Sequence, residues 1–281
     1  MTAGSTHFLA RPLARLILGC LFVVVPMILV KWLIRRFALS ASAESTLSDL
    51  LGAFVALLGY VAYVRWIERR AVSELSGRSA TPELIVGFAI GVLLFGLTIG
   101  ALTLAGAYRV MGRAPLGVMV APLAAAVSAG IVEELLFRGI LFRIVESAVG
   151  SWLALALSAV VFGLLHLLNA HASIQGAVAI MLESGILLAA AFMLTRHLWL
   201  PIGLHIGWNF TQGGIFGVAV SGTPTTGTLQ GSLSGPDWLS GGIFGAEASL
   251  IAVTICLIVS VIFLRLALRR DNVVQLSRVS A

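Results

Sequence analysis

Residues 116–141 read LGVMVAPLAAAVSAGIVEELLFRGIL, an apolar run that is long enough to cross a lipid bilayer. Its charged residues are Glu133, Glu134 and Arg138, all in the second half of the run. Ionisable side chains are costly inside a membrane, so charged residues at this depth indicate a functional site by default. The stretch therefore predicts both a transmembrane helix and a place where chemistry occurs.

The whole chain has the composition of an integral membrane protein. Of its 281 residues, 59% are hydrophobic and 11% are charged, and the mean hydropathy is +1.05. Soluble domains carry about 25% charged residues. The net charge is +6, but the basic residues flank apolar runs and form no basic stripe with interleaved aromatic residues. We therefore expect contact with a lipid bilayer and no nucleic-acid partner.

Eight stretches are apolar enough to serve as membrane spans of about 20 residues. We therefore predict an all-α fold, a polytopic transmembrane bundle of about eight helices. The stretches are 13–32, 47–65, 83–107, 116–141, 151–169, 173–195, 199–220 and 246–268.

The basic residues also predict an orientation, because lysine and arginine collect on the cytoplasmic side of membranes. Arginines are frequent in 66–82 and in the tail after the last span, which includes Arg278, whereas 221–245 contains no lysine or arginine. With eight spans, both arginine-containing segments face the cytoplasm and 221–245 faces outward. This assignment places three basic residues on the outer side of the membrane, which counts against it: Lys31, Arg35 and Arg36.

Two connecting segments have features of their own. Residues 66–82 are expected to form a solvated connector, in which Glu74 and Arg78 support each other one helical turn apart. Residues 221–242 are rich in Gly, Ser, Thr and Pro, which indicates a flexible loop that would also suit a lid.

Glu133 and Glu134 have different expected tasks, because adjacent residues on a helix point about 100° apart. Glu134 and Arg138 are four residues apart and can pair. Glu133 is then free to face a cavity and act as a general base. The alternative is that all three charges form one buried ion-pair network.

Two further polar pairs lie in later spans. Phe162 and His166 share one helical face, as do His205 and Asn209. Two hydrogen-bond donors one turn apart, such as His205 and Asn209, can hold a carbonyl oxygen that gains negative charge. The alternatives are a packing histidine in the first pair and an interhelical polar clamp in the second. Other polar residues are less informative: Asn169 and His171 read as interfacial residues, and Glu183 is left unassigned.

Taken together, Glu133-Glu134-x-x-x-Arg138, Phe162-x-x-x-His166 and His205-x-x-x-Asn209 on successive membrane helices resemble the motifs of the CPBP family. That family includes the CAAX prenyl endopeptidases and bacterial proteins once called Abi or bacteriocin-immunity proteins. The resemblance covers about residues 115–220.

The resemblance implies an intramembrane protease core with a cavity open towards the cytoplasm. It implies that Glu133 and His166 activate water, that His205 and Asn209 form an oxyanion hole, and that Glu134, Arg138 and Phe162 support them. No cofactor is needed in this reading. In the alternative, Glu133, His166 and His205 bind Zn²⁺.

These expectations divide the chain into three regions. Residues 1–112 hold N-terminal transmembrane helices and a cytoplasmic connector, 113–220 the catalytic core, and 221–281 an extracytoplasmic loop, the last span and a cytoplasmic tail. The predicted substrate is a membrane protein or lipidated peptide, and the predicted location is a bacterial inner membrane. Two other functions stay open, a non-catalytic immunity or scaffold protein and a transporter that relays protons through Glu133, Glu183 and the histidines.

Overall fold

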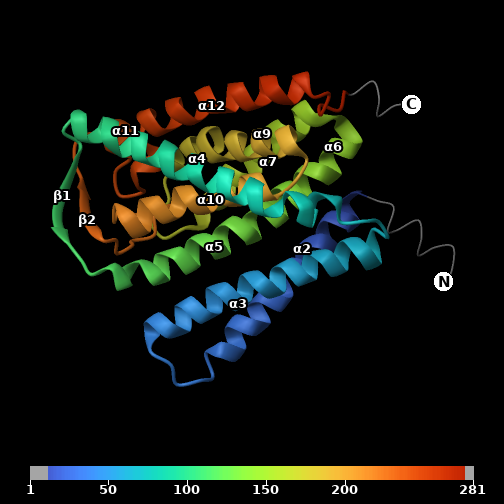
Figure 1. Ribbon diagram of the computed structural model, residues 1–281, viewed down its shortest axis with the longest axis horizontal. Coiled ribbons are helices and arrows are strands. Elements are labelled where there is room, and N and C mark those ends of the chain that lie inside the picture. Colours follow the sequence, from blue (N-terminus) through green and yellow to red (C-terminus); the bar gives the residue numbers. More distant parts are fainter. Residues whose placement is uncertain (1–11, 276–281) are drawn as a thin grey trace.

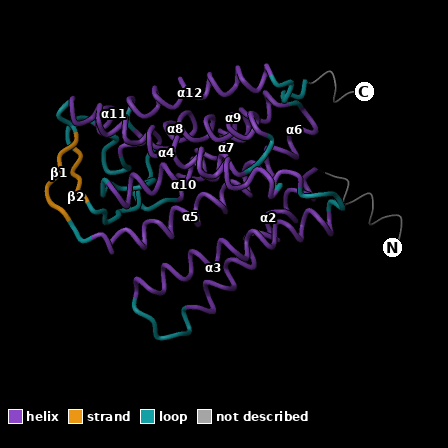
Figure 2. The backbone as a smooth tube through the Cα atoms, in the orientation of Figure 1, coloured by secondary structure: helices purple, strands orange, loops and turns teal. Residues whose placement is uncertain are grey.

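The computed structural model describes residues 12–275 and confirms the all-α membrane bundle (Figures 1 and 2). Arg278 lies outside the described residues. Within 12–275, seven helical stretches are long and apolar enough to cross a membrane: Pro12–Ile34, Ala41–Ile67, Gly77–Leu104, Leu116–Val149, Ser151–Leu168, Ile174–Thr195 and Leu250–Arg269. The remaining predicted span, 199–220, is shorter than expected, because its helix ends at Ile215.

Several of these stretches join an α-helix to a π-helical or 3₁₀ segment. The first three spans are α2 (Pro12–Ile34), α3 (Ala41–Ala62) with the π-helical η1 (Tyr63–Ile67), and α4 (Gly77–Leu104), which follows the short η2 (Ser73–Leu75). The next three spans comprise η3 (Leu116–Met119), α5 (Val120–Glu134), the π-helical η4 (Leu135–Phe142), α6 (Arg143–Val149), α7 (Ser151–Leu165), η5 (His166–Leu168), α8 (Ile174–Ile180), the π-helical η6 (Met181–Gly185) and α9 (Ile186–Thr195). The chain continues through α10 (Trp199–Phe210), the π-helical η7 (Thr211–Ile215), η8 (Ala246–Ala248) and α12 (Leu250–Arg269).

The short helix α10 lies in the middle of the bundle, where α4, α5 and α9 pack against it (Figure 1). Its close approach to α4 depends on two glycine pairs, Gly87 and Gly91 on α4 and Gly203 and Gly207 on α10. A Cβ at any of the four would collide with a backbone carbonyl oxygen of the facing helix. Small residues at this spacing let membrane helices approach closely, and here they fix the helix that carries His205 and Asn209.

A small antiparallel sheet closes one end of the bundle, at the left of Figure 1. Strand β1 (Tyr108–Arg113) pairs with β2 (Leu229–Leu233), with an irregularity between Val110 and Gly112. The short helix α11 (Asp237–Ser240) follows β2. The expectation of a loop over 221–242 therefore needs correction in part, because residues 229–233 pair with β1 and residues 237–240 form a short helix.

The opposite end of the molecule gathers arginines, and we call it the arginine-rich end. Within residues 12–275, nine arginines lie in or beside the helix ends and connections there: Arg15, Arg65, Arg69, Arg70, Arg78, Arg143, Arg196, Arg269 and Arg270. Hydrogen bonds tie its segments together, for example from Arg143 to Glu68, from Arg196 to Glu146 and from the Leu198 amide to the Glu74 carbonyl oxygen.

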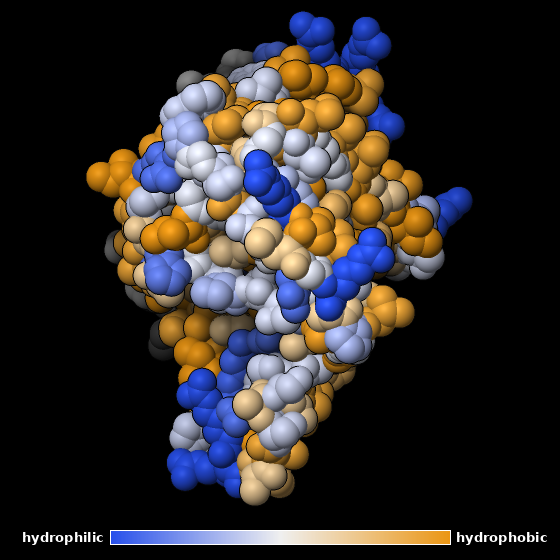
Figure 3. All heavy atoms as spheres, turned by 90° about the vertical axis from the view of Figure 1, so that its left-hand side faces the viewer, coloured by the Kyte–Doolittle hydropathy of each residue, from blue (hydrophilic) through white to orange (hydrophobic). Residues whose placement is uncertain are grey.

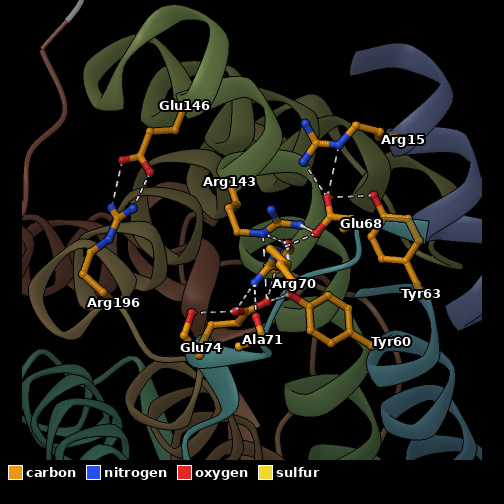
Figure 4. A network of polar contacts seen from close by, with 12 residues as sticks. Arg15, Tyr60, Tyr63, Glu68, Arg70, Ala71, Glu74, Arg143, Glu146 and Arg196 are labelled. Carbon is orange, nitrogen blue, oxygen red and sulfur yellow. Dashed lines mark hydrogen bonds and ion pairs between the residues drawn. The ribbon is translucent and has the colours of Figure 1, made fainter. Parts of the chain in front are cut away.

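Much of the connector at this end is exposed, as expected, but its carboxylates Glu68 and Glu74 are buried in a polar network that Figure 4 draws. Glu68 accepts hydrogen bonds from Arg15 at 2.6 Å, from Arg70 at 2.8 Å and from Arg143 at 2.5 Å. Burial opposes the charged form of Glu68, but these guanidinium groups outweigh it and lower the pKa of Glu68 to about 2.

Glu74 is buried in the same network. It accepts from both terminal nitrogens of Arg70, at 2.6 and 2.7 Å, and from the Tyr60 hydroxyl. The predicted pair of Glu74 with Arg78 was therefore wrong, because Arg70 holds the Glu74 carboxylate from the other side.

Candidate functional site

A cavity of about 410 Å³ lies between α5, α7, α10 and the turn at 220–225. It brings together Glu133, His166, His205 and Asn209, the four residues that the sequence singled out on three separate helices. The rest of the wall is mostly small or apolar, with Pro122, Ala125, Ala126, Ala129, Phe137, Leu165 and Gly213 among the lining residues.

Glu133 lines the cavity, and its carboxylate has one oxygen to which no described residue donates a hydrogen bond. Its side chain is 29% exposed, and among the described residues its buried Oε2 has no hydrogen-bond partner. The nearest cationic candidate is His205, whose Nε2 lies 3.9 Å from this oxygen, which is too far for a hydrogen bond. A buried polar oxygen without a protein partner is satisfied by water or substrate.

Glu134 points away from the cavity and is completely buried. Its Oε1 accepts from Arg138 Nη1 at 2.8 Å and also lies 3.0 Å from His205 Nδ1. Arg138 is completely buried as well, and its Nη2 donates to the carbonyl oxygens of Ser184 and Gly185 at 3.1 Å each. The pair therefore joins α5 and η4 to η6 and, through His205, to α10.

His166 stands where α7 ends, and Phe162 orients it. Its Nδ1 lies 2.8 Å from the Phe162 carbonyl oxygen, and the two rings are 4.8 Å apart between centroids. A carbonyl oxygen only accepts, so Nδ1 carries the proton and the neutral ring has its lone pair on Nε2. The Phe162 ring is itself fixed, because it packs on Phe137 at 4.7 Å and under the Arg138 guanidinium at 4.7 Å.

His205 and Asn209 reach the cavity from successive turns of α10. The carboxylate of Glu134 accepts a hydrogen bond from His205 Nδ1, which turns Nε2 towards Glu133 and the cavity. With Nδ1 protonated, Nε2 is an acceptor in the neutral ring and a donor in the imidazolium. Two carboxylates beside the ring favour the imidazolium form.

The turn at 220–225 forms a wall of the cavity that the sequence reading missed. Ser221 has a left-handed backbone, with φ of 48°, and two side chains hold it: Asn169 donates to its carbonyl oxygen at 2.8 Å, and Glu247 accepts from its amide. Burial raises the pKa of Glu247 to about 7. Asn169, expected to be merely interfacial, also lines the cavity. These contacts make the turn a clamped wall rather than a loose lid.

A second, smaller cavity of about 260 Å³ reaches Glu133 from the side of the bundle. It lies between α5 and the pair α2 and α3, with Met27, Asp49, Ser128 and Val132 among its walls. Glu133 thus lines both the main cavity and this side cavity.

Glu183, left unassigned in the sequence, does not line the main cavity. It is buried behind Arg138, where it accepts from the Ser184 hydroxyl at 2.5 Å and from Cys256 Sγ at 3.5 Å.

The same geometry bears on whether these residues can bind zinc. Within residues 12–275, no three His, Cys, Asp or Glu side chains converge closely enough to hold a metal ion. Glu133, His166 and His205 as placed therefore do not fit a zinc site, and no reaction step below uses a metal.

Residues 115–211 match the family model described as type II CAAX prenyl endopeptidase Rce1-like. This part of the chain is similar to the Rce1-like family. The match covers about a third of the chain and includes all the motif residues from Glu133 to Asn209. The family is one of CAAX-type membrane proteases, which confirms the resemblance seen in the sequence. Comparisons with curated proteins and with solved structures found no match.

The Rce1-like segment runs from just before η3 to the first residue of η7. It therefore contains the helices that carry the site but neither the turn at 220–225 nor Glu247. The chain is a multi-pass membrane protein with an Rce1-like core, and Gly213 and the turn at 220–225 complete its cavity from outside the matched segment.

Proposed function

We propose that this protein is an intramembrane endopeptidase that hydrolyses a peptide bond of a membrane-associated or prenylated peptide. The observation that carries the proposal is the unpartnered, buried Oε2 of Glu133 in a cavity shared with two imidazoles and a carboxamide. The Rce1-like family of the core supports the same reaction class.

In the proposed reaction, a water molecule binds between Glu133 and the Nε2 lone pair of His166. Glu133 takes one proton from this water as general base, and the resulting hydroxide attacks the carbonyl carbon of the scissile bond. The bond to the leaving nitrogen then breaks, and the same proton passes from Glu133 to the amine. No acyl-enzyme forms, because the nucleophile is water.

His205 and Asn209 would stabilise the negative charge that develops on the carbonyl oxygen. Donors fixed before the reaction are effective because they need no reorganisation during it. Glu134 fixes the His205 ring through Nδ1 at 3.0 Å and favours the imidazolium, whose Nε2 proton points into the cavity. Glu134 and Arg138 are thus positioning residues that act through His205 and through the helix carrying Glu133.

The side cavity supports the proposal that the substrate is partly embedded in lipid. A peptide whose apolar anchor stays in the bilayer can pass between α3 and α5 to reach Glu133, since this opening is bordered by the small side chains of Ala125, Ser128 and Ala129.

A comparison of membrane peptides in cells tests the proposal. Cells with wild-type protein should contain cleavage products that are absent from cells with Glu133→Ala, at equal amounts of inserted protein. Glu44→Ala is the matched control, because Glu44 lies at the start of α3 away from the cavity, and its peptides should equal those of wild type. Identical peptides in all three would overturn the proposed function.

A further inference from the structure

We infer that the cavity opens on the extracytoplasmic face of the membrane, so that the enzyme cleaves peptide bonds presented on that side. The cleavage itself rests on the proposed function, but the orientation is a separate claim with a separate test.

The cavity opens towards the start of α5. The lining residues beyond Glu133 along α5 are Ala129, Ala126, Ala125 and Pro122, which lead towards the start of that helix. The remaining rim consists of Asn169, just after α7, and the turn at 220–225. All of these lie towards the end that carries β1 and β2, which we call the mouth end; Figure 3 looks directly at it.

In the opposite direction the cavity is closed. Phe137 lies in η4, which directly follows α5, and it is the cavity-lining residue of this span that is nearest to the arginine-rich end. The next residue, Arg138, is fully buried. One residue further, the Gly139 carbonyl oxygen accepts from the Tyr60 hydroxyl, which belongs to the network of Glu74 and Arg70. Arg138 and the polar network drawn in Figure 4 therefore fill the bundle beyond Phe137, so that the cavity does not continue to the arginine-rich end.

The mouth end and the arginine-rich end also differ in their number of basic residues. The connections 166–173 and 216–249, which surround the mouth, contain no lysine or arginine. The basic residues in the other mouth-end connections and beside them are fewer than the nine at the arginine-rich end: Lys31, Arg35, Arg36, Arg109 and Arg113. Because basic residues beside spans stay in the cytoplasm, the arginine-rich end is cytoplasmic and the mouth faces out.

This placement departs from the cytoplasmic cavity that the family resemblance implied. It also narrows the substrate class to membrane-anchored or lipidated peptides whose scissile bond lies in the extracytoplasmic half of the bilayer or just outside it. The side cavity agrees, because its walls on α5 from Ala125 to Val132 lie in the mouth half of that span and Glu133 lies at the middle of it.

Cysteine labelling tests the orientation without any need for activity. In a Cys20→Ala, Cys256→Ala background, Thr226→Cys places a thiol on the exposed mouth end, and Ala148→Cys is the matched exposed position at the arginine-rich end. A membrane-impermeant maleimide added to intact cells should label Thr226→Cys and should label Ala148→Cys only after permeabilisation. The reverse pattern would overturn the inference.

Two further readouts connect the orientation to the cavity. Thr223 is exposed and lines the cavity, whereas Thr226 does not line it. External labelling of Thr223→Cys with a bulky impermeant maleimide should therefore block cleavage at least tenfold, while labelling of Thr226→Cys should not. Glu133-dependent cleavage sites should map to extracytoplasmic segments of their substrates.

The outcomes separate the two claims. Cleavage sites confined to cytoplasmic segments would overturn the inference and leave the proposed function standing. External labelling of Thr226→Cys with no Glu133-dependent cleavage anywhere would overturn the proposed function and leave the orientation standing.

Discussion

Carboxylates at the arginine-rich end of this bundle and in its cavity have opposite surroundings. At the arginine-rich end, Glu68 and Glu74 are held by arginine and tyrosine side chains that converge on them. In the cavity, Glu133 keeps one oxygen without a partner among the described residues. A carboxylate surrounded by cations stabilises a fold and is chemically quiet, whereas an unpaired one beside a cavity is available to react.

The largest expected effect follows from replacing the unpaired carboxylate. Glu133→Gln should lower turnover of a cleaved membrane peptide by about 10²-fold or more, because a general base contributes about 10²–10⁴-fold. Its thermal unfolding in detergent should match that of wild type. Glu74→Gln should do the opposite, with a lower melting temperature and, once folded, near-normal turnover. If both variants lost activity only in proportion to unfolding, the contrast between the cavity and the arginine-rich end would disappear.

Asn209→Ala should have the next largest effect on catalysis. Loss of one oxyanion donor costs about 10²–10³-fold in kcat, and KM should change little because the donor acts mainly in the transition state. Steady-state kinetics of the purified protein measure both constants. A rise in KM with normal kcat would show that Asn209 only binds substrate.

The buried pair of Glu134 and Arg138 should affect stability more than chemistry. Glu134→Gln leaves the Arg138 guanidinium, which is 0% exposed, without its counter-charge. Removing one partner of such a pair costs about 3–5 kcal/mol. The double variant Glu134→Gln, Arg138→Met should recover part of this loss in thermal unfolding. Equal melting temperatures for wild type and both variants would refute the positioning role.

Acid should weaken the arginine-rich end through Glu68. Its folded pKa, about 2, lies below the ordinary value of 4.5, so its contribution to stability is fully present above pH 4.5 and is lost as pH falls towards 2. Glu68→Gln should be less stable at neutral pH and lose less stability on acidification. Melting temperatures of both proteins across this pH range measure the difference, and parallel curves would contradict it.

The smallest expected effect is that of chelation. Because Glu133, His166 and His205 do not converge as a metal site, cleavage by the purified protein should continue unchanged in excess EDTA. Loss of activity that stoichiometric zinc restores would favour the metal reading instead.

The sequence predicted the bundle and the candidate residues for the same reason: polar side chains stand out in apolar runs. Glu133, His166, His205 and Asn209 were recognisable by helical spacing alone. Contacts between distant segments were not predictable in this way. Glu134 reaches His205 across 71 residues, and Arg143 reaches Glu68 across 75. The pairing of β1 with β2 and the capture of Ser221 by Glu247 depend on the same long-range packing.

Chemical rescue tests most directly whether Glu133 acts as a cavity carboxylate. Glu133→Ala leaves space beside the cavity for a small carboxylate, so added formate should restore part of its cleavage activity in a concentration-dependent manner. Glu134→Ala should not respond, because the Glu134 site is sealed at 0% exposure. Wild-type activity of Glu133→Ala without formate, or rescue of Glu134→Ala alone, would contradict the assignment of Glu133 as the base.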